Sequence, residues 1–285
     1  MEQFTERGHH ADADHDTAHA VTQLTASLSD MRELVERSVA RVRREESDAV
    51  AMFLCGSRVR GEAGLFSDFD FDVLVPKGPR DRAMEWFDGP VRVSAWVRDI
   101  DLWLAERDVP QEWAFHLPCE DLLRLCWSAS DEWRERLDRK ALPHRAGTPE
   151  LDHLIGDAAK VANARRAGDE LGLRLAAQDL ARSCPALLHP VNKVSPVHSR
   201  RAALRAATEM AVAPPTYQED LLACLGLTAG PTTAAQVYTA AGRLALGVLD
   251  ILAAHDATYA PLLPADLLAD LRAGVLRSFV ERAFG

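Results

Sequence analysis

The sequence contains little lysine, few cysteines and no long apolar run. Its 285 residues include five cysteines, and no two of them form a CxxC pair or stand at a Cys/His spacing typical of zinc sites. An odd number of cysteines also argues against a disulfide framework. We therefore expect small buried thiols at Cys55, Cys119, Cys126, Cys184 and Cys224.

No apolar run approaches the roughly 20 residues that a membrane helix needs. Residues 1–28 are rich in His, Asp and Thr and lack the apolar segment of a secretory signal. We interpret this stretch as a flexible N-terminal tail. With 47% hydrophobic and 27% charged residues, the composition is ordinary for a soluble globular protein. The expected location is the cytoplasm, without a membrane segment.

Basic charge comes almost wholly from arginine, because lysine occurs only at positions 77, 140, 160 and 193. The formal net charge of -10 repels the phosphate backbone of a nucleic acid unless basic residues cluster strongly. The same charge attracts a cationic small molecule. Nucleic acid is therefore a disfavoured partner, and whether the chain forms a homodimer is left open.

The length of the chain favours two domains over one compact core. A linker with Pro and Gly near 142–149 separates a first domain over 29–145 from a second over 148–285. In the first, apolar patterns predict helices at 30–46 and 132–140 and strands at 49–55, 69–75, 91–97 and 122–127. The second has long Ala/Leu-rich stretches that predict a helical bundle, at 151–167, 170–188, 200–211, 233–255 and 265–284. The expected fold class is an α/β (α+β) domain followed by an all-α domain.

A glycine turn and a row of carboxylates carry the clearest chemistry. Gly56 and Ser57 follow an apolar strand directly, and Asp68, Asp70 and Asp72 stand at alternate positions of the next one. Side chains alternate along a strand, so the three carboxylates share one face and repel each other. A divalent cation such as Mg²⁺ or Mn²⁺ relieves that repulsion and prefers such oxygen ligands.

The turn suits a phosphate. A glycine at position 56 allows close backbone approach, and Ser57 offers a backbone N–H and a hydroxyl to a phosphate oxygen. Arg58 and Arg60 leave the turn where phosphate charge would lie, although solvated arginine is an equally common outcome. The combination predicts a site for a nucleoside triphosphate (NTP) and a metal ion, with a simple turn and an exposed strand face as the alternative.

These residues resemble the signature of a known superfamily. The segment Gly56-Ser57-Arg58-Val59-Arg60-Gly61-Glu62, followed by Ser67-Asp68-Phe69-Asp70, is similar to that of the DNA polymerase β-type nucleotidyltransferases, in their small, antibiotic-modifying branch. The resemblance covers 49–75. It implies a mixed sheet, phosphate contacts from Gly56 and Ser57, and Mg²⁺ on Asp68 and Asp70. More diffusely, 119–285 looks like the helical half of kanamycin-type nucleotidyltransferases.

The chain departs from the family at the third carboxylate. The family usually places that acid on the neighbouring strand, where this chain has Arg92 and Ser94. A general base must then be Asp72, or come from the helical domain, or be unnecessary. The kanamycin-type resemblance implies Asp157 as base and Lys160 as phosphate partner, whereas an ordinary exposed ion pair between positions i and i+3 is the alternative.

Two further residues of the helical domain are weaker candidates for a catalytic role. Arg182 and His189 show a spacing similar to that of small helical ribonucleases. Pro185 between them is expected to interrupt the helix on which such a site would rest. We therefore expect both residues to be structural.

The sequence predicts an Mg²⁺-dependent enzyme that transfers a nucleoside monophosphate, AMP from ATP in the first instance, to a hydroxyl of a small molecule. An aminoglycoside-like antibiotic suits the acidic charge, and pyrophosphate would leave. The alternatives are an adenylylating antitoxin, a tRNA-modifying transferase, and a non-catalytic NTP-binding regulator, which the missing third acid would suit.

Overall fold

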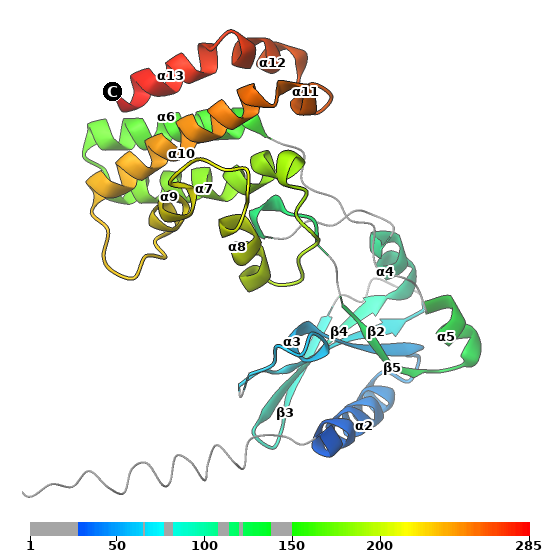
Figure 1. Cartoon of the computed structure of the whole chain (residues 1–285). Coiled ribbons are helices and arrows are strands. Elements are labelled where there is room, and N and C mark those ends of the chain that lie inside the picture. The colour runs from blue at the N-terminus through cyan, green and yellow to red at the C-terminus, as the bar shows by residue number, and fades with distance from the viewer. Residues whose placement is uncertain (1–27, 65, 77–81, 108–113, 120–121, 138–149) are drawn as a thin grey trace, which may run out of the picture. The chain divides into compact units, whose positions relative to one another are not determined.

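The computed structural model describes residues 28–64, 66–76, 82–107, 114–119, 122–137 and 150–285. The chain divides into two compact units (Figure 1), one of residues 1–107 with 122–140 and the other of 108–121 with 141–285. The predicted tail up to residue 27 and the predicted linker at 142–149 lie outside the described residues.

The first unit is built on a five-stranded mixed sheet in the order β3-β4-β2-β1-β5. Strands β2 and β4 are parallel, whereas the other neighbouring pairs are antiparallel. The bounds are β1 Ala51–Cys55, β2 Phe69–Val75, β3 Arg82–Asp88, β4 Val91–Asp99 and β5 Arg124–Ser128. Helices α2 (Leu28–Glu45), α3 (Gly56–Val59), α4 (Ile100–Arg107) and α5 (Asp131–Leu137) complete the unit. This architecture confirms the predicted α/β fold with a mixed sheet.

Side chains along β2 alternate between the two faces of the sheet. Phe69, Phe71 and Val73 are buried in a cluster with apolar residues of α2. Leu74 points to the opposite face, where Trp103 of α4 stacks on Phe53 with ring centroids 5.2 Å apart. The alternating aspartates of β2 share this second face because side chains two residues apart point the same way.

Strand β3 and helix α4 are absent from the predicted elements. Strand β3 pairs antiparallel with β4 through the turn at Gly89. Its exposed residues, among them Phe87, obscure the alternation that identifies a half-buried strand. The dipeptide Asp88-Gly89 is nevertheless a hairpin signal, and it would have predicted a strand before 91–97.

The second unit is helical, as predicted. Its elements are η1 Ala114–His116, α6 Leu151–Ala167, α7 Glu170–Asn192, α8 Arg200–Thr208, α9 Tyr217–Leu225, α10 Ala234–Ala254, α11 Asp256–Tyr259, α12 Ala265–Arg272 and α13 Val275–Phe284. Their buried leucine, alanine and valine side chains form one apolar core. The predicted helix at 265–284 is divided at Gly274, which has a positive φ of 70°.

Helix α7 corrects the prediction that Pro185 interrupts it. The helix runs through Pro185 and Pro190 to Asn192. A proline inside a helix removes one backbone hydrogen bond, but this stretch is anchored by side chains such as Cys184 and Leu187, both 0% exposed. Burial of this apolar face outweighs the lost hydrogen bond, since tertiary packing supplies most helical stability in proteins.

Helix α10 is long and apolar enough to cross a membrane by length and hydropathy alone. The apolar-run criterion above missed it because a glycine, an arginine and polar residues interrupt the stretch. Half of its most apolar window is buried within the protein, and residues such as Leu244 and Val248 belong to the core of the helical unit. A core helix accounts for this pattern.

Candidate functional site

The glycine turn lies directly against the aspartate strand. In the antiparallel pairing of β1 and β2, Cys55 is opposite Asp70, so Gly56 follows at the end of that row. Gly56 has a φ of 73°, and a Cβ atom at this position would stand 2.5 Å from Asp70 Oδ2. A side chain there would be strained by its backbone and would collide with the carboxylate. The structure thus brings together the two halves of the predicted site.

Arg58 fixes the chain that leads into β2. Its guanidinium donates from Nε to the Asp68 carbonyl at 3.1 Å and from Nη2 to the Ser67 carbonyl. It also lies over the Phe69 ring, 4.1 Å from the centroid. Burial lowers the pKa of Arg58, and the nearby Asp68 opposes that shift. These contacts make Arg58 a positioning residue for Asp68, and its predicted contact with phosphate stays a prediction.

Asp70 is a partly buried carboxylate in a crowded acidic row. Burial raises the pKa of Asp70, and the charge of Asp68 raises it further, while Arg92 and Arg60 lower it. Asp72 adds a smaller upward effect. The folded protein therefore disfavours the ionised form of Asp70, and a cation bound beside this carboxylate would stabilise that form.

Asp72 shares the face but has a structural partner. Its Oδ2 accepts a hydrogen bond from Trp103 Nε1 at 3.0 Å. Within the described residues, no three His, Cys, Asp or Glu side chains are arranged to hold a metal ion. Asp68, Asp70 and Asp72 therefore do not form a preassembled three-ligand group in the described residues, and metal binding by these three side chains stays a prediction.

Two carboxylates still fit Mg²⁺ or Mn²⁺. Mg²⁺ is usually bound through one or two carboxylates together with substrate phosphates and water. Asp68 and Asp70 provide hard oxygen donors beside the Gly56 turn, and because burial and then the charge of Asp68 raise the pKa of Asp70, a bound cation would stabilise its ionised form. The donor chemistry is therefore suited to these metals once a nucleotide is present.

The strand beside β2 has no acid at the expected place. In the parallel pairing of β2 and β4, Ser94 is opposite Asp70. Arg92 of the same strand donates from Nη1 to Asp68 Oδ2 at 2.9 Å and from Nη2 to Glu85 Oε1 at 2.8 Å. A cation thus stands near the place of the expected third carboxylate.

Glu85 is an acid that the sequence analysis missed. In the pairing of β3 and β4 it is opposite Ser94, so it lies in the same row of the sheet as Asp70. If β3 had been predicted from its hairpin turn, Glu85 would have been placed in the row of Asp70. Arg60, also on this side, pairs with Glu62 Oε2 at 3.1 Å and is only 17% exposed.

Asp157 and Lys160 belong to the helical unit. Lys160 Nζ is 2.8 Å from Asp157 Oδ1. Unlike the fully exposed pair considered above, Asp157 is buried at 8% exposure, whereas Lys160 is solvated. The hydrogen bond to Asp157 raises the pKa of Lys160. Both residues line a pocket of about 450 Å³, which Asp179 and Arg182 also line.

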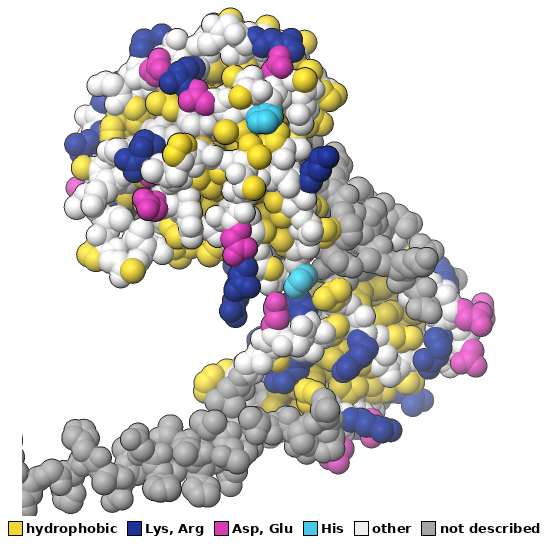
Figure 2. All heavy atoms as spheres, viewed as in Figure 1, with side chains coloured by type: hydrophobic (Ala, Val, Ile, Leu, Met, Phe, Trp, Pro, Cys, Tyr) yellow, Lys and Arg dark blue, Asp and Glu magenta, His cyan; other side chains and the backbone are white. Residues whose placement is uncertain are grey.

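The visible surface of the described residues carries interspersed charges. Figure 2 shows acidic and basic side chains mixed on each unit, without a continuous basic patch on the visible faces of the described parts.

Comparison with known proteins identifies part of the chain. Residues 150–254 match a family model described as the substrate-binding domain of nucleotidyltransferases. A solved structure, the nucleotidyltransferase-like protein from Exiguobacterium sibiricum 255-15, is 10% identical; the alignment covers 81% of this chain and 78% of that one, with a TM-score of 0.40. No curated protein matches the chain. The family match supports the nucleotidyltransferase superfamily and nucleotidyl transfer as the general activity.

Proposed function

We propose that this protein transfers a nucleoside monophosphate from an NTP, with ATP as the preferred donor, to a hydroxyl of a small acceptor. The observation that carries the proposal is the contact between the Gly56 turn and Asp70, where a Cβ atom would stand 2.5 Å from the carboxylate. The glycine lets the turn lie directly against the acid that we propose as a metal ligand, so that a triphosphate bound at the turn would share that metal.

In this proposal some residues bind the nucleotide and the metal, and others keep these ligands in position. The Gly56-Ser57 turn would hold the phosphates, and Arg58 keeps Asp68 in place through its carbonyl. Asp68 and Asp70 would hold Mg²⁺ or Mn²⁺, which supplies charge neutralisation at the phosphates. Arg60, which lowers the pKa of Asp70, adds positive charge on the same side.

The reaction is an in-line displacement at phosphorus. The acceptor oxygen forms a bond to the α-phosphorus, and the bond from that phosphorus to the oxygen bridging the β-phosphate breaks. Pyrophosphate leaves with the electron pair of the broken bond. The hydroxyl proton passes to a general base, for which we propose Asp157, with Lys160 as its charged partner.

One observation favours the non-catalytic alternative. Arg92 holds Asp68 in an ion pair at 2.9 Å, close to the strand position that lacks the third acid. If that pair persists with nucleotide present, Asp68 does not reach a metal, and the protein binds NTP without turnover. Release of pyrophosphate separates the two functions.

The decisive experiment is an acceptor screen with labelled ATP, GTP, CTP and UTP, in which pyrophosphate and product mass are followed. The panel includes aminoglycosides and hydroxyl compounds of neutral and anionic charge. We expect acceptor-dependent pyrophosphate release with ATP and a product heavier by one nucleotidyl group. Tight ATP binding without any product would instead establish the regulator. Absence of NTP binding would overturn both functions.

A further inference from the structure

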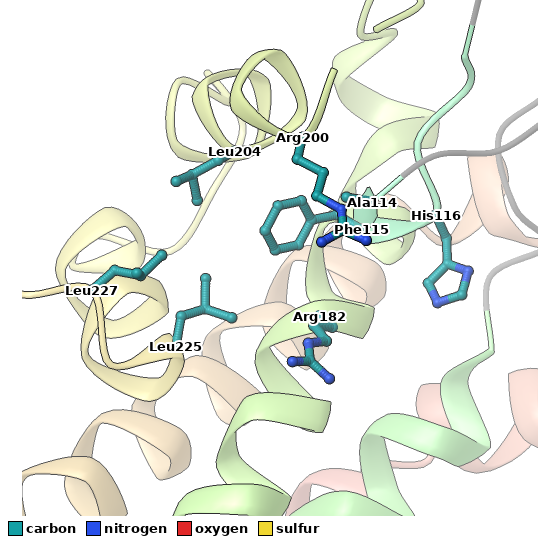
Figure 3. A pocket seen from close by; sticks show the side chains of 8 residues that line it. All are labelled: Ala114, Phe115, His116, Arg182, Arg200, Leu204, Leu225 and Leu227. Carbon is teal, nitrogen blue, oxygen red and sulfur yellow. The ribbon is translucent and has the colours of Figure 1, made fainter. Parts of the chain in front are cut away.

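A second pocket in the helical unit has a different character from the one beside Asp157. It has a volume of about 810 Å³, within the usual range of about 300 to 1,000 Å³ for small-molecule sites. Figure 3 shows its walls, which come from η1, α7, α8 and the end of α9. The lining residues are Ala114, Phe115, His116, Arg182, Arg200, Leu204, Leu225 and Leu227.

The lining combines an apolar side with two arginines. Figure 3 shows Phe115 facing the three leucines, with Arg182 below and Arg200 above its ring. Among the described lining residues there is no carboxylate. Arg182 has Asp179 at 3.4 Å as an exposed partner, while Arg200 makes no ion pair with any residue that the structure describes. Positive charge in this pocket is thus only partly compensated.

Arg200 also stands in the first turn of α8. Ser199 caps that helix by accepting a hydrogen bond from the Ala202 backbone N–H at 3.1 Å, and the first turn holds no acidic residue. The N-terminal end of a helix favours negative charge. The helix dipole and the Arg200 guanidinium therefore both favour a negatively charged ligand.

The segment that presents Phe115 is held in an unusual backbone conformation. Phe115 and His116 have positive φ values of 65° and 52°, a region that bulky residues rarely adopt. The next residues anchor the segment: Leu117 is 0% exposed, and the Val197 N–H donates to the Pro118 carbonyl at 2.9 Å. Strain of this kind persists where the surroundings impose it, often at binding sites.

We propose that this pocket binds a small molecule with an apolar body and one anionic head, a carboxylate or a phosphate. The head would pair with Arg182 and Arg200, and the body would lie between Phe115 and the leucines. Arg182 and His116 line both this pocket and the one beside Asp157. If the proposed function holds, the anionic molecule is therefore the acceptor, with a hydroxyl beside its anionic head on the side toward Asp157. This charge is opposite to that of an aminoglycoside.

The test measures binding to the full-length protein by titration calorimetry, without nucleotide. The probes share one apolar body and differ in the head group: 4-phenylbutyrate, 4-phenylbutyl phosphate, 4-phenylbutanol and 4-phenylbutylamine. At least one anion should bind about tenfold tighter than the alcohol, and the amine should bind weakest, because charge-assisted hydrogen bonds are the strong ones. The better of the two anions identifies the head group.

Three variants locate the site. Arg182→Gln and Arg200→Gln should each weaken binding of the preferred anion by about tenfold. Arg201→Gln, which removes the neighbouring exposed charge on α8, is the matched control and should leave binding unchanged. All three arginines are exposed, so the variants should fold, which circular dichroism checks. The proposal fails if the amine or alcohol binds as tightly as the anions, if neither anion binds at millimolar concentration, or if Arg201→Gln weakens binding equally.

A transfer assay then links the pocket to the reaction. The acceptor is 2-hydroxy-4-phenylbutyrate, whose hydroxyl stands beside the carboxylate, compared with its amine counterpart. Transfer that favours the acid and falls in Arg200→Gln supports the assignment of the pocket to the acceptor. Anion binding without any transfer leaves the pocket in place and overturns its role as acceptor site. Transfer to aminoglycosides without any anion binding overturns the pocket proposal and leaves the proposed function standing.

Discussion

Gly56 is the residue whose substitution tests the site most directly. In Gly56→Ala, the new Cβ atom would meet Asp70 Oδ2 at 2.5 Å, and the φ of 73° would be strained as well. We expect a loss of unfolding free energy of about 1 to 2 kcal/mol from the backbone alone. We also expect ATP affinity to fall at least about tenfold as the turn moves away from Asp70. Urea unfolding and calorimetric titration of ATP measure the two effects.

Gly61 provides the matched control for this substitution. It has a φ of 71°, but an added Cβ atom would have no neighbour within 4 Å. Gly61→Ala should therefore show a similar backbone cost and keep its ATP affinity. Equal loss of ATP binding in the two variants would mean that backbone strain, and not contact with Asp70, explains the result.

Asp70→Asn should separate stability from activity. Burial and Asp68 raise the pKa of Asp70 above its ordinary value, so the ionised form destabilises the folded protein. The destabilising effect of the ionised form is therefore lost as pH falls through the raised pKa and below the ordinary value, where the native residue is neutral like asparagine. In metal-free buffer the variant should be more stable than the wild type at pH 7, and the difference should be smaller at pH 4.

Transfer by Asp70→Asn should fall at least about 100-fold, the scale of a lost electrostatic contact in an active site. Urea unfolding at both pH values and a pyrophosphate assay check these outcomes. A variant less stable than wild type at pH 7, or one with near-normal turnover, would contradict the assigned environment.

Among the elements, helix α6 carries the proposed base. Asp157 is buried and bound to Lys160, whereas Asp266 of α12 is exposed and lies outside the pocket beside Asp157. Asp157→Asn should slow transfer at least about tenfold, since a general base typically contributes about 100- to 10,000-fold. Its ATP affinity should not change. Asp266→Asn is the control in the same unit and should turn over normally.

Single-turnover rates and ATP titrations distinguish these outcomes. Normal turnover in Asp157→Asn would remove the base from α6 and point to Asp72, whose contact with Trp103 would then have to open. Loss of ATP affinity in Asp157→Asn would show a binding role instead.

At the scale of the molecule, tryptophan reports on the first unit. Trp86, Trp96, Trp103, Trp127 and Trp133 all lie in it, whereas Trp113 lies outside the described residues. In a Trp113→Phe background, fluorescence therefore follows unfolding of the first unit. Mg²⁺ with ATP at 100 times its dissociation constant should stabilise that transition by about 2.7 kcal/mol.

Excess EDTA should abolish this stabilisation, as should Asp70→Asn. Zinc should substitute poorly, because the proposed ligands are carboxylate and phosphate oxygens. Full stabilisation by ATP in EDTA would show that the metal has no part in binding.

Four of the five described strands, the glycine turn and the succession of an α/β fold and a helical fold were predictable from the sequence alone, whereas β3 was missed. An apolar run that ends at Gly56, and alternation in 69–75, depend on neighbours along the chain, so β1 and β2 were predicted near their observed bounds. The long helices were predictable for the same reason. The aspartates at alternate positions needed no tertiary information to be placed on one face.

Which side chains contact one another depends on the folded chain and was not predictable from the sequence. Trp103 holds Asp72, Arg92 holds Asp68, and Glu85 shares a row with Asp70 through two strand pairings. Packing also carried α7 through Pro185, which brings Arg182 and Arg200 to one pocket. These contacts join residues far apart in the chain, and local propensity carries no information about such partners because their energies arise from burial and charge in the folded state.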